Sequence, residues 1–354
     1  MKWTAIDLGQ AEIKAAVYNT SSNKPERLVY NEGLSYSYMP HGVVVSNDEV
    51  YIGHQVLLLA AMGVDGVVSK INESPFKEKI IKKIFSTIRN ASEEHYAESM
   101  VGAVLLFDDA TSRNNIEKAI HEYKDKRKVI DSVIARLALD TFSEVTCVCS
   151  SEAISSMYVP NQTPSLIVDL GHTALKISIV ANGKQVSFHI NEKLGFKEVD
   201  LSDIVGYDFS LDVSDAERIL FGKYLSDVVK LNLIHNHSNY YPLPIFKDMT
   251  KGKTNIQNRF DAEMERYLYK CLDYCNCLVQ KTEWRWNNIG SIIFCGGAAN
   301  YHLLSHTFEN YRKDYGIADA ISVKTFCKDA EWISAFSAIQ LPLDRNSSSV
   351  IVEY

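Results

Sequence analysis

The sequence predicts a mixed α/β protein built from two related halves. Short apolar segments, each long enough for one strand, alternate with charged segments whose apolar residues recur at helical spacing. Asp7-Leu8-Gly9 ends the first apolar segment, and Asp169-Leu170-Gly171 ends another one about 160 residues later. This internal echo predicts two lobes that face a common cleft, with lobe I over 1–160, lobe II over 161–340 and a tail over 341–354.

In the first half, most expected strands are short apolar runs, and the helices between them are charged and amphipathic. Helices are expected over 54–62, 76–90, 114–123 and 127–140, the last with apolar residues at a 3.6-residue period. Strands are expected over 2–7, 14–18, 27–30, 43–45, 50–52, 100–107 and 145–149.

The second half repeats this arrangement. Helices are expected over 214–234 and 256–283, and Asn182-Gly183 predicts a tight hairpin turn. A further apolar strand ends at Gly296-Gly297, which is expected to open a helix. The strands of this half are expected over 165–169, 174–180, 185–190 and 291–295.

Composition favours an ordinary globular protein of a reducing compartment. Hydrophobic residues make up 46% and charged residues 23% of the 354 residues, and the formal net charge is −7. The charge argues against nucleic-acid binding, and the sequence has neither a signal peptide nor an apolar run long enough for a membrane span. The seven cysteines have no disulfide-rich spacing. We therefore expect a cytoplasmic protein, with the nucleus as the alternative.

The cysteines and histidines form no convincing set of metal ligands. Cys147 and Cys149 share one face of an expected strand, while Cys271 and Cys275 share one face of an expected helix. Zinc sites pair such cysteines with a second set of ligands, which the sequence lacks. Buried structural thiols are the favoured interpretation, because free cysteine is among the most buried residue types.

The chemistry of the candidate site comes from the turns that follow the apolar strands. A tight turn directs backbone N–H groups outward, and glycine lets a phosphate approach closely. Two such turns can hold the phosphates of a nucleotide, and an aspartate at each strand end can hold the hydrated Mg²⁺ that accompanies them. Gly296-Gly297 would suit the close approach of a flat group such as adenosine.

The order of these turns resembles that of a known superfamily. The segments Asp7-Leu8-Gly9, Asp169-Leu170-Gly171 and Gly296-Gly297 resemble the phosphate-1, phosphate-2 and adenosine motifs of actin, sugar kinases and heat-shock ATPases. The chain is similar over most of its length to the nucleotide domain of DnaK-type (heat-shock 70 kDa) chaperones. The resemblance implies a two-lobed actin-like ATPase fold (ribonuclease-H-like) with a central nucleotide cleft.

The resemblance also assigns roles to individual residues. Lys70 would reach the γ-phosphate, Glu152 would order the attacking water, and Asp7 and Asp169 would lie near Mg²⁺. Lys230 would belong to the adenosine pocket. The remaining residues implied to bind ATP or ADP lie on the turns; they are Gly9, Gln10, Gly171, His172, Thr173, Gly195, Gly296 and Gly297.

Several positions depart from the family pattern. Gln10 stands where the family has threonine, and Lys176 stands where it has aspartate. Leu231 and Asn300 replace arginines of the adenosine pocket. Catalysis needs groups aimed at the transition state, so two or three such losses predict weak or absent hydrolysis with weak binding retained. Lys176 would either add positive charge for phosphate or pair with Asp169 and close the Mg²⁺ site.

The first functional hypothesis is a stand-alone, divergent chaperone-type nucleotide-binding domain that acts on a protein partner through its surface. It would lack the peptide-binding domain of the chaperones. The alternatives are an actin-like filament-forming ATPase of the plasmid-segregation type, a pseudo-ATPase scaffold that binds no nucleotide, and a small-molecule kinase of the same superfamily. Of these interpretations, filament formation and kinase activity are not preferred.

Overall fold

The computed structural model describes residues 2–9, 12–31, 35–36, 38–40, 42–46, 49–52, 67–70, 77–126, 133–159, 163–199, 234, 256–326 and 329–346. The chain divides into two compact units. Unit 1 consists of Met1–Tyr158 and Trp332–Tyr354, and unit 2 consists of Val159–Glu331. Each unit combines a mixed β-sheet with helices, which confirms the expected α/β class.

Unit 1 is built on a sheet with the strand order β11-β10-β1-β2-β3. Strand β1 runs parallel to β10 and antiparallel to β2; β10 runs parallel to β11, and β2 runs antiparallel to β3. A further strand, β6 (Tyr38–Pro40), also pairs with β2. The five strands of the main path are β1 (Lys2–Leu8), β2 (Glu12–Asn19), β3 (Lys24–Arg27), β10 (Val101–Phe107) and β11 (Val145–Cys149).

Two small sheets complete the strands described in unit 1. One is a two-stranded pair, and the other has the order β8-β7-β9. Their strands are β4 (Tyr30–Asn31), β5 (Ser35–Tyr36), β7 (Gly42–Ser46), β8 (Glu49–Tyr51) and β9 (Val67–Lys70).

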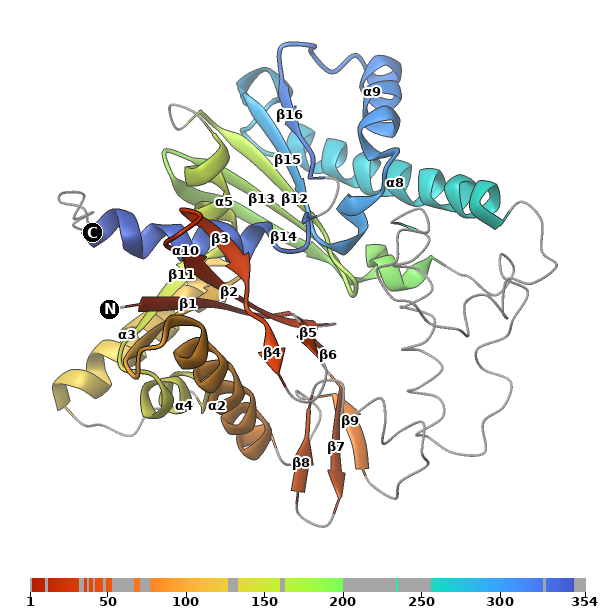
Figure 1. The fold of residues 1–354 in the computed structure, drawn as a ribbon. Coiled ribbons are helices and arrows are strands. Elements are labelled where there is room, and N and C mark those ends of the chain that lie inside the picture. The colour runs from red at the N-terminus through yellow and green to blue at the C-terminus, as the bar shows by residue number, and fades with distance from the viewer. Residues whose placement is uncertain are drawn as a thin grey trace. The chain divides into compact units, whose positions relative to one another are not determined.

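Helices cover both faces of the main sheet of unit 1 (Figure 1). Because side chains alternate across a strand, Ile6 and Val17 pack on one face while Ala5 and Ala16 pack on the other. The first face is covered by α2 (Lys77–Tyr96), α3 (Ala110–Lys126) and α4 (Val133–Thr141). The second is covered by α5 (Ser150–Tyr158) and α10 (Ile333–Asn346).

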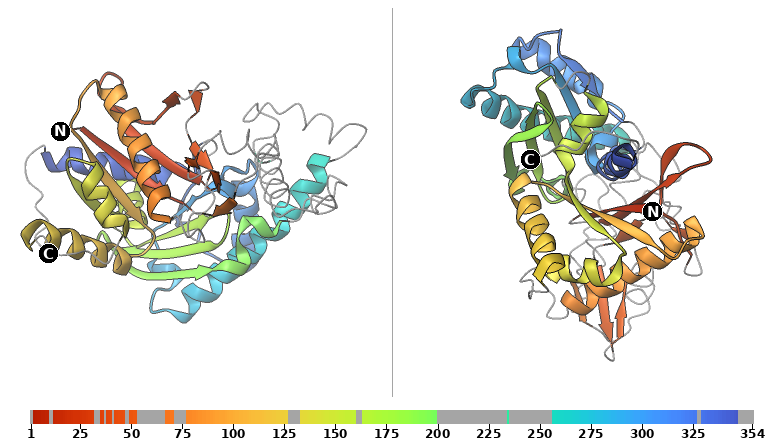
Figure 2. Two further views of the ribbon diagram at one scale, coloured as in Figure 1. Left: turned by 90° about the horizontal axis from the view of Figure 1, so that it is seen from below. Right: turned by 90° about the vertical axis from the view of Figure 1, so that its left-hand side faces the viewer.

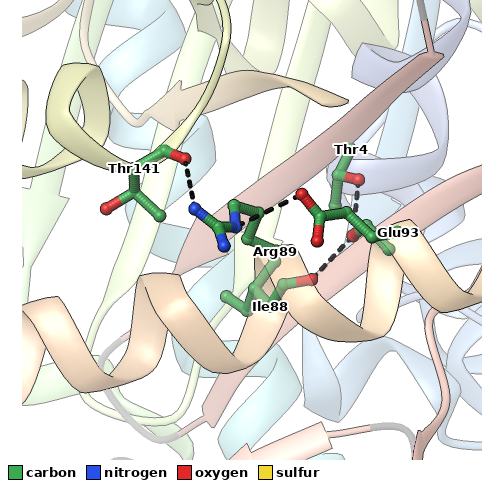
Figure 3. A network of polar contacts seen from close by, with 6 residues as sticks. Thr4, Ile88, Arg89, Glu93 and Thr141 are labelled. Carbon is green, nitrogen blue, oxygen red and sulfur yellow. Dashed lines mark hydrogen bonds and ion pairs between the residues drawn. The ribbon is translucent and has the colours of Figure 1, made fainter. Parts of the chain in front are cut away.

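Polar contacts join α2 to the sheet and to α4. The Thr4 hydroxyl donates to Ser92 Oγ at 2.8 Å, and Ser92 in turn donates to the Ile88 carbonyl at 2.7 Å; both hydroxyl side chains are fully buried. Arg89 donates to the Thr141 carbonyl at 3.5 Å and lies 3.4 Å from Glu93 (Figure 3). Buried hydroxyls need such partners, because an unpaired one costs desolvation energy.

Unit 2 is built on a sheet with the order β14-β13-β12-β15-β16. Its main core lies on one face, where α8 (Ile256–Lys281) and α9 (Leu304–Tyr315) pack on Leu166, Val168 and Ile177. Figure 2 shows α8 as the long cyan helix beside the green strands of this sheet. The strands are β12 (Ser165–Leu170), β13 (Leu175–Ala181), β14 (Lys184–Asn191), β15 (Ser291–Cys295) and β16 (Ser322–Lys324). Short 3-10 helices are η3 (Glu192–Leu194), η4 (Phe196–Glu198), η6 (Trp286–Asn288) and η7 (Gly297–Asn300).

The main sheets of the two units follow the same plan. In chain order, the first three strands form an antiparallel meander in each unit, and the fourth and fifth then continue in parallel from the first strand. The two Asp-Leu-Gly motifs therefore lie at the same place in both sheets, at the end of the middle strand, which is β1 in unit 1 and β12 in unit 2.

Most of the expected strands and long helices are confirmed within a few residues of their predicted bounds. The strand over 291–295 is found as β15 with the same bounds. The strand expected over 27–30 is instead β3, over Lys24–Arg27, and Leu28 and Tyr30 follow it as buried core residues. The expected helix over 54–62, and 214–233 of the helix expected over 214–234, lie outside the described residues. Among the helices that the structure describes, none is long and apolar enough to cross a membrane.

Candidate functional site

The best-defined part of the candidate site is the turn between β12 and β13 in unit 2. Leu170 and Leu175 are paired across the two strands and are buried in the core, which fixes the turn over residues 171–174. Asp169 is one residue before Leu170, so its side chain projects from the opposite face of the sheet. The turn therefore places a carboxylate beside a glycine-containing loop.

Asp169 and Lys176 occupy directly opposite positions on β12 and β13. Lys176 Nζ lies 3.6 Å from Asp169 Oδ2, and the side chains are 17% and 28% exposed, respectively. Side chains opposite each other in an antiparallel pair lie on the same face and interact. The alternative in which Lys176 pairs with Asp169 is thus the arrangement observed.

A second turn packs directly on the first. The backbone N–H groups of Phe196 and Lys197 donate to the carbonyls of Gly171 and His172 at 2.9 and 2.8 Å. A Cβ on Gly195 would overlap the Thr173 carbonyl group, so only glycine allows this close approach of two backbones.

Helix α8 holds the second turn in place. Tyr267 donates from its hydroxyl to the Leu194 carbonyl at 3.2 Å, and its ring centroid lies 6.0 Å from that of Phe196. Burial raises the pKa of the Tyr267 phenol well above its ordinary value, so this donor stays protonated. The loop with Gly171, His172 and Thr173 therefore packs on the Gly195 turn, and that turn in turn packs on α8.

The third glycine turn reaches the same carboxylate. Gly296 has φ 88° and ψ 167°, a conformation that is essentially restricted to glycine. A Cβ at this position would overlap Asp169 Oδ1 and lie 2.7 Å from the Leu170 carbonyl oxygen. The structure therefore brings Asp169, Gly171, Gly195 and Gly296 together.

Gly297 differs from these glycines. A Cβ added to it would meet no heavy atom of the described structure within 4 Å, and its φ lies outside the left-handed region. The described residues therefore leave open space where a side chain at position 297 would lie, and their packing does not require glycine there. Gly296 and Gly297 lead into the short helix η7, and the first α-helix after it, α9, begins only at Leu304.

Asn300, which stands at the family's arginine position, is part of the core. It is 2% exposed, its side-chain oxygen accepts from the Ala330 backbone N–H at 3.0 Å, and its side-chain nitrogen donates to the Glu331 carboxylate. The Gly296 N–H donates to the Ala330 carbonyl at 3.0 Å. The side-chain amide of Asn300 thus links this turn to Ala330 and Glu331, with both its oxygen and its nitrogen used in these hydrogen bonds.

Unit 1 carries the corresponding turn between β1 and β2. Asp7 is paired with Lys14 across the two strands, in the same register that pairs Asp169 with Lys176. Gly9 directly follows β1, whereas Gln10 lies outside the described residues. Lys230 also lies outside them, and Lys70 is the last residue of β9, opposite Gly42 of β7.

Glu152 lies in the first turn of α5, where it faces an arginine that sequence reasoning missed. Arg113 of α3 places a guanidinium nitrogen 3.6 Å from the Glu152 carboxylate, and the two side chains are only 14% and 13% exposed. The pair places an opposite charge beside the Glu152 carboxylate in a largely buried position. No local sequence pattern connects two residues that lie 39 positions apart (152 − 113).

Magnesium fits poorly beside Asp169. One carboxylate oxygen faces the Lys176 ammonium group, and the other lies where it would overlap a Cβ added to Gly296. Among the described residues there is no group of three or more His, Cys, Asp or Glu side chains that could hold a metal ion. Cys147, Cys149, Cys271 and Cys275 are buried, as expected, whereas Cys277 of α8, for which burial was also expected, is exposed.

Comparison with known proteins adds no assignment to this geometry. No protein-family model and no curated protein matches the chain.

Proposed function

We propose that the chain is a divergent nucleotide-binding domain of the DnaK-like branch of the actin-like ATPases. It binds ATP or ADP, hydrolyses ATP weakly or not at all, and acts on a protein partner through its surface. The observation that carries the proposal is the packing of three glycine-containing turns, of which those at Gly171 and Gly296 lie beside Asp169 and that at Gly195 lies against the Gly171 loop, with open space beside Gly297. Two sheets with one common strand plan support the two-lobed fold that the resemblance implies.

The turns of unit 2 suit an anionic ligand. The loop over residues 171–174 offers backbone groups, Lys176 offers a positive charge, and glycine at 297 admits a group that any side chain would displace. In this proposal, the phosphates lie on the Gly171 loop and the adenosine lies over Gly297.

The expectation of weak hydrolysis comes from altered residues such as Gln10 and Lys176, and the surroundings of Glu152 add to it. The family role of this residue is to order the attacking water, but Arg113 engages the carboxylate here. General-base and positioning roles require an available oxygen near the water. We therefore expect ATP turnover to be slow compared with an enzyme whose carboxylate is available.

Calorimetry with the full chain tests the proposal. ATP and ADP should bind with Kd values tighter than about 1 mM. Gly297→Val should weaken binding at least about tenfold, because the branched side chain fills the space over the turn. Ser322→Val is the matched control, because it introduces the same branched side chain at an exposed position. Ser322 lies on β16, opposite Ser291 at the start of β15 and so at the other end of that strand from Gly297.

The two variants should unfold at the same urea concentration as the parent chain. Loss of binding in Gly297→Val together with retained binding in Ser322→Val supports the site. Absence of binding to the parent chain refutes it and favours the second candidate, a pseudo-ATPase scaffold. The burial of Asn300 against Glu331 is the observation that favours this second candidate, because it commits the residue at the family's arginine position.

A further inference from the structure

We propose that the ammonium group of Lys176 takes the place of a divalent cation beside Asp169. Unit 2 would then bind its phosphate-bearing ligand without magnesium. This inference rests on the proposed function, since it specifies how the same site receives a nucleotide. It concerns the chemistry of the ligand, which would be the metal-free nucleotide rather than its magnesium complex.

The position of Lys176 is fixed by the sheet. Lys176 and Asp169 are directly paired in an antiparallel ladder whose neighbouring residues, Leu175 and Ile177, are core residues. A shift of register by one residue would move these core residues to the opposite face. The 3.6 Å separation between Lys176 Nζ and Asp169 Oδ2 is therefore a consequence of strand pairing.

The Asp169 carboxylate has a cation beside one oxygen and the Gly296 turn close to the other. Oδ2 faces Lys176, while Oδ1 lies so close to Gly296 that a Cβ there would overlap it. A magnesium ion, even with its water shell, would have to share this position with an ammonium group of the same sign. Lysine carries three N–H donors on a compact charge, so it can contact the carboxylate and a phosphate oxygen together.

The same cross-strand placement of an aspartate and a lysine recurs in unit 1, which supports a common use. Asp7 and Lys14 are directly paired on β1 and β2, and the aspartate–lysine spacing is seven positions in both units (14 − 7 and 176 − 169). Each lysine follows the turn that would receive phosphate. A pairing required for only one sheet would have no reason to recur at the corresponding place in the other.

The experiment measures ADP binding to the full chain by calorimetry, in buffer with millimolar magnesium and in buffer with excess EDTA. The parent chain should show Kd values that agree within about threefold between the two buffers. Lys176→Gln keeps the length of the stem and removes the charge. We expect it to bind at least about tenfold more weakly in EDTA and to recover affinity when magnesium is added.

Lys184→Gln is the matched control, because Lys184 lies on the neighbouring strand β14 at the far end of the β13–β14 hairpin. It should behave like the parent chain in both buffers. Binding by the parent chain that requires magnesium overturns this inference and leaves the proposed function in place. Unchanged affinity of Lys176→Gln in EDTA also overturns it, because the pair would then be structural only. If the parent chain binds ADP in neither buffer, both this inference and the proposed function are overturned.

Discussion

Asp169 lies so close to Gly296, which directly follows the neighbouring strand β15, that a Cβ added to Gly296 would overlap Asp169 Oδ1. Residue 296 follows Cys295, which is paired with Asp169 in the parallel ladder between β12 and β15. This contact links the Gly296-Gly297 turn to the end of β12 within one unit. It also distinguishes two adjacent glycines, because Gly297 has no comparable neighbour.

Gly296→Ala should destabilise the protein strongly, and Gly297→Ala should not. The first substitution combines an unfavourable backbone conformation, which costs about 1–3 kcal/mol, with overlap against Asp169 and the Leu170 carbonyl. The second should change the free energy of unfolding by less than about 1 kcal/mol. Urea unfolding of both variants measures the difference. Equal stability of the two variants would refute the conformation described for Gly296.

The buried hydroxyl pair of unit 1 should show non-additive energetics. Ser92→Ala leaves the Thr4 hydroxyl without the acceptor it uses, which should cost about 1–3 kcal/mol of stability (Figure 3). Adding Thr4→Val removes the Thr4 hydroxyl that has lost its acceptor, so the double variant should be more stable than Ser92→Ala alone. A double-mutant cycle by urea unfolding measures this coupling. Purely additive effects would contradict the contact.

Tyr96 should make stability fall at alkaline pH. Its hydroxyl donates to the Trp3 carbonyl at 2.7 Å and accepts from the Tyr18 N–H at 2.8 Å, and burial raises its pKa from 10.0 to about 12. Between these values the unfolded chain loses the proton while the folded chain keeps it. The stability contribution is therefore complete below about pH 10 and is lost as the pH rises towards 12.

Tyr96→Phe should flatten this decline. The variant should be less stable than the parent chain near neutral pH, by about 1–3 kcal/mol, because two hydrogen bonds are lost. Its free energy of unfolding should then fall less steeply between about pH 10 and pH 12. Chemical unfolding across this pH range measures both quantities. Parallel curves for the two proteins would show that Tyr96 does not titrate as stated.

Arg113 and Glu152 should be energetically coupled. Arg113→Met leaves a largely buried carboxylate without its guanidinium neighbour, which should cost about 1–3 kcal/mol. Glu152→Gln removes the charge, so the double variant should recover part of the loss. The expected coupling energy exceeds about 0.5 kcal/mol and is measured by thermal or urea unfolding of all four proteins. A smaller value would indicate that the pair contributes little at its observed distance of 3.6 Å.

Much of the fold could be predicted from the sequence, because its strands are continuous apolar runs between turn residues. The strand before Gly296 illustrates this, as all five of its residues are buried. Strand β3 was misplaced for the converse reason. Its sequence, Lys-Pro-Glu-Arg, is polar and suits the edge of a sheet, while the buried residues after it are Leu28, between two strands, and Tyr30, which begins β4.

The grouping of the three turns could be expected from the resemblance, but contacts between individual side chains of the candidate site could be predicted only between residues that are close in sequence. The spacing of Asp169 and Lys176 across a short turn already allowed the pairing that the structure shows. The contacts of Glu152 with Arg113, and of Asn300 with Glu331, join residues from separate elements. Only the packing of those elements brings such residues together, so the sequence pattern contains no signal for them.

The division of unit 1 into two stretches of chain has a consequence for biosynthesis. Helix α10 covers a sheet face through Ala335, Ala338 and Ile339, and the strands that it covers include β1 and β2, which are translated long before it. The whole of unit 2 is translated between these strands and their covering helix. Until then, Ala5, Ala16 and Val104 lack part of their cover. A nascent chain should therefore complete unit 2 before unit 1, and holdase chaperones should bind it most strongly during that interval.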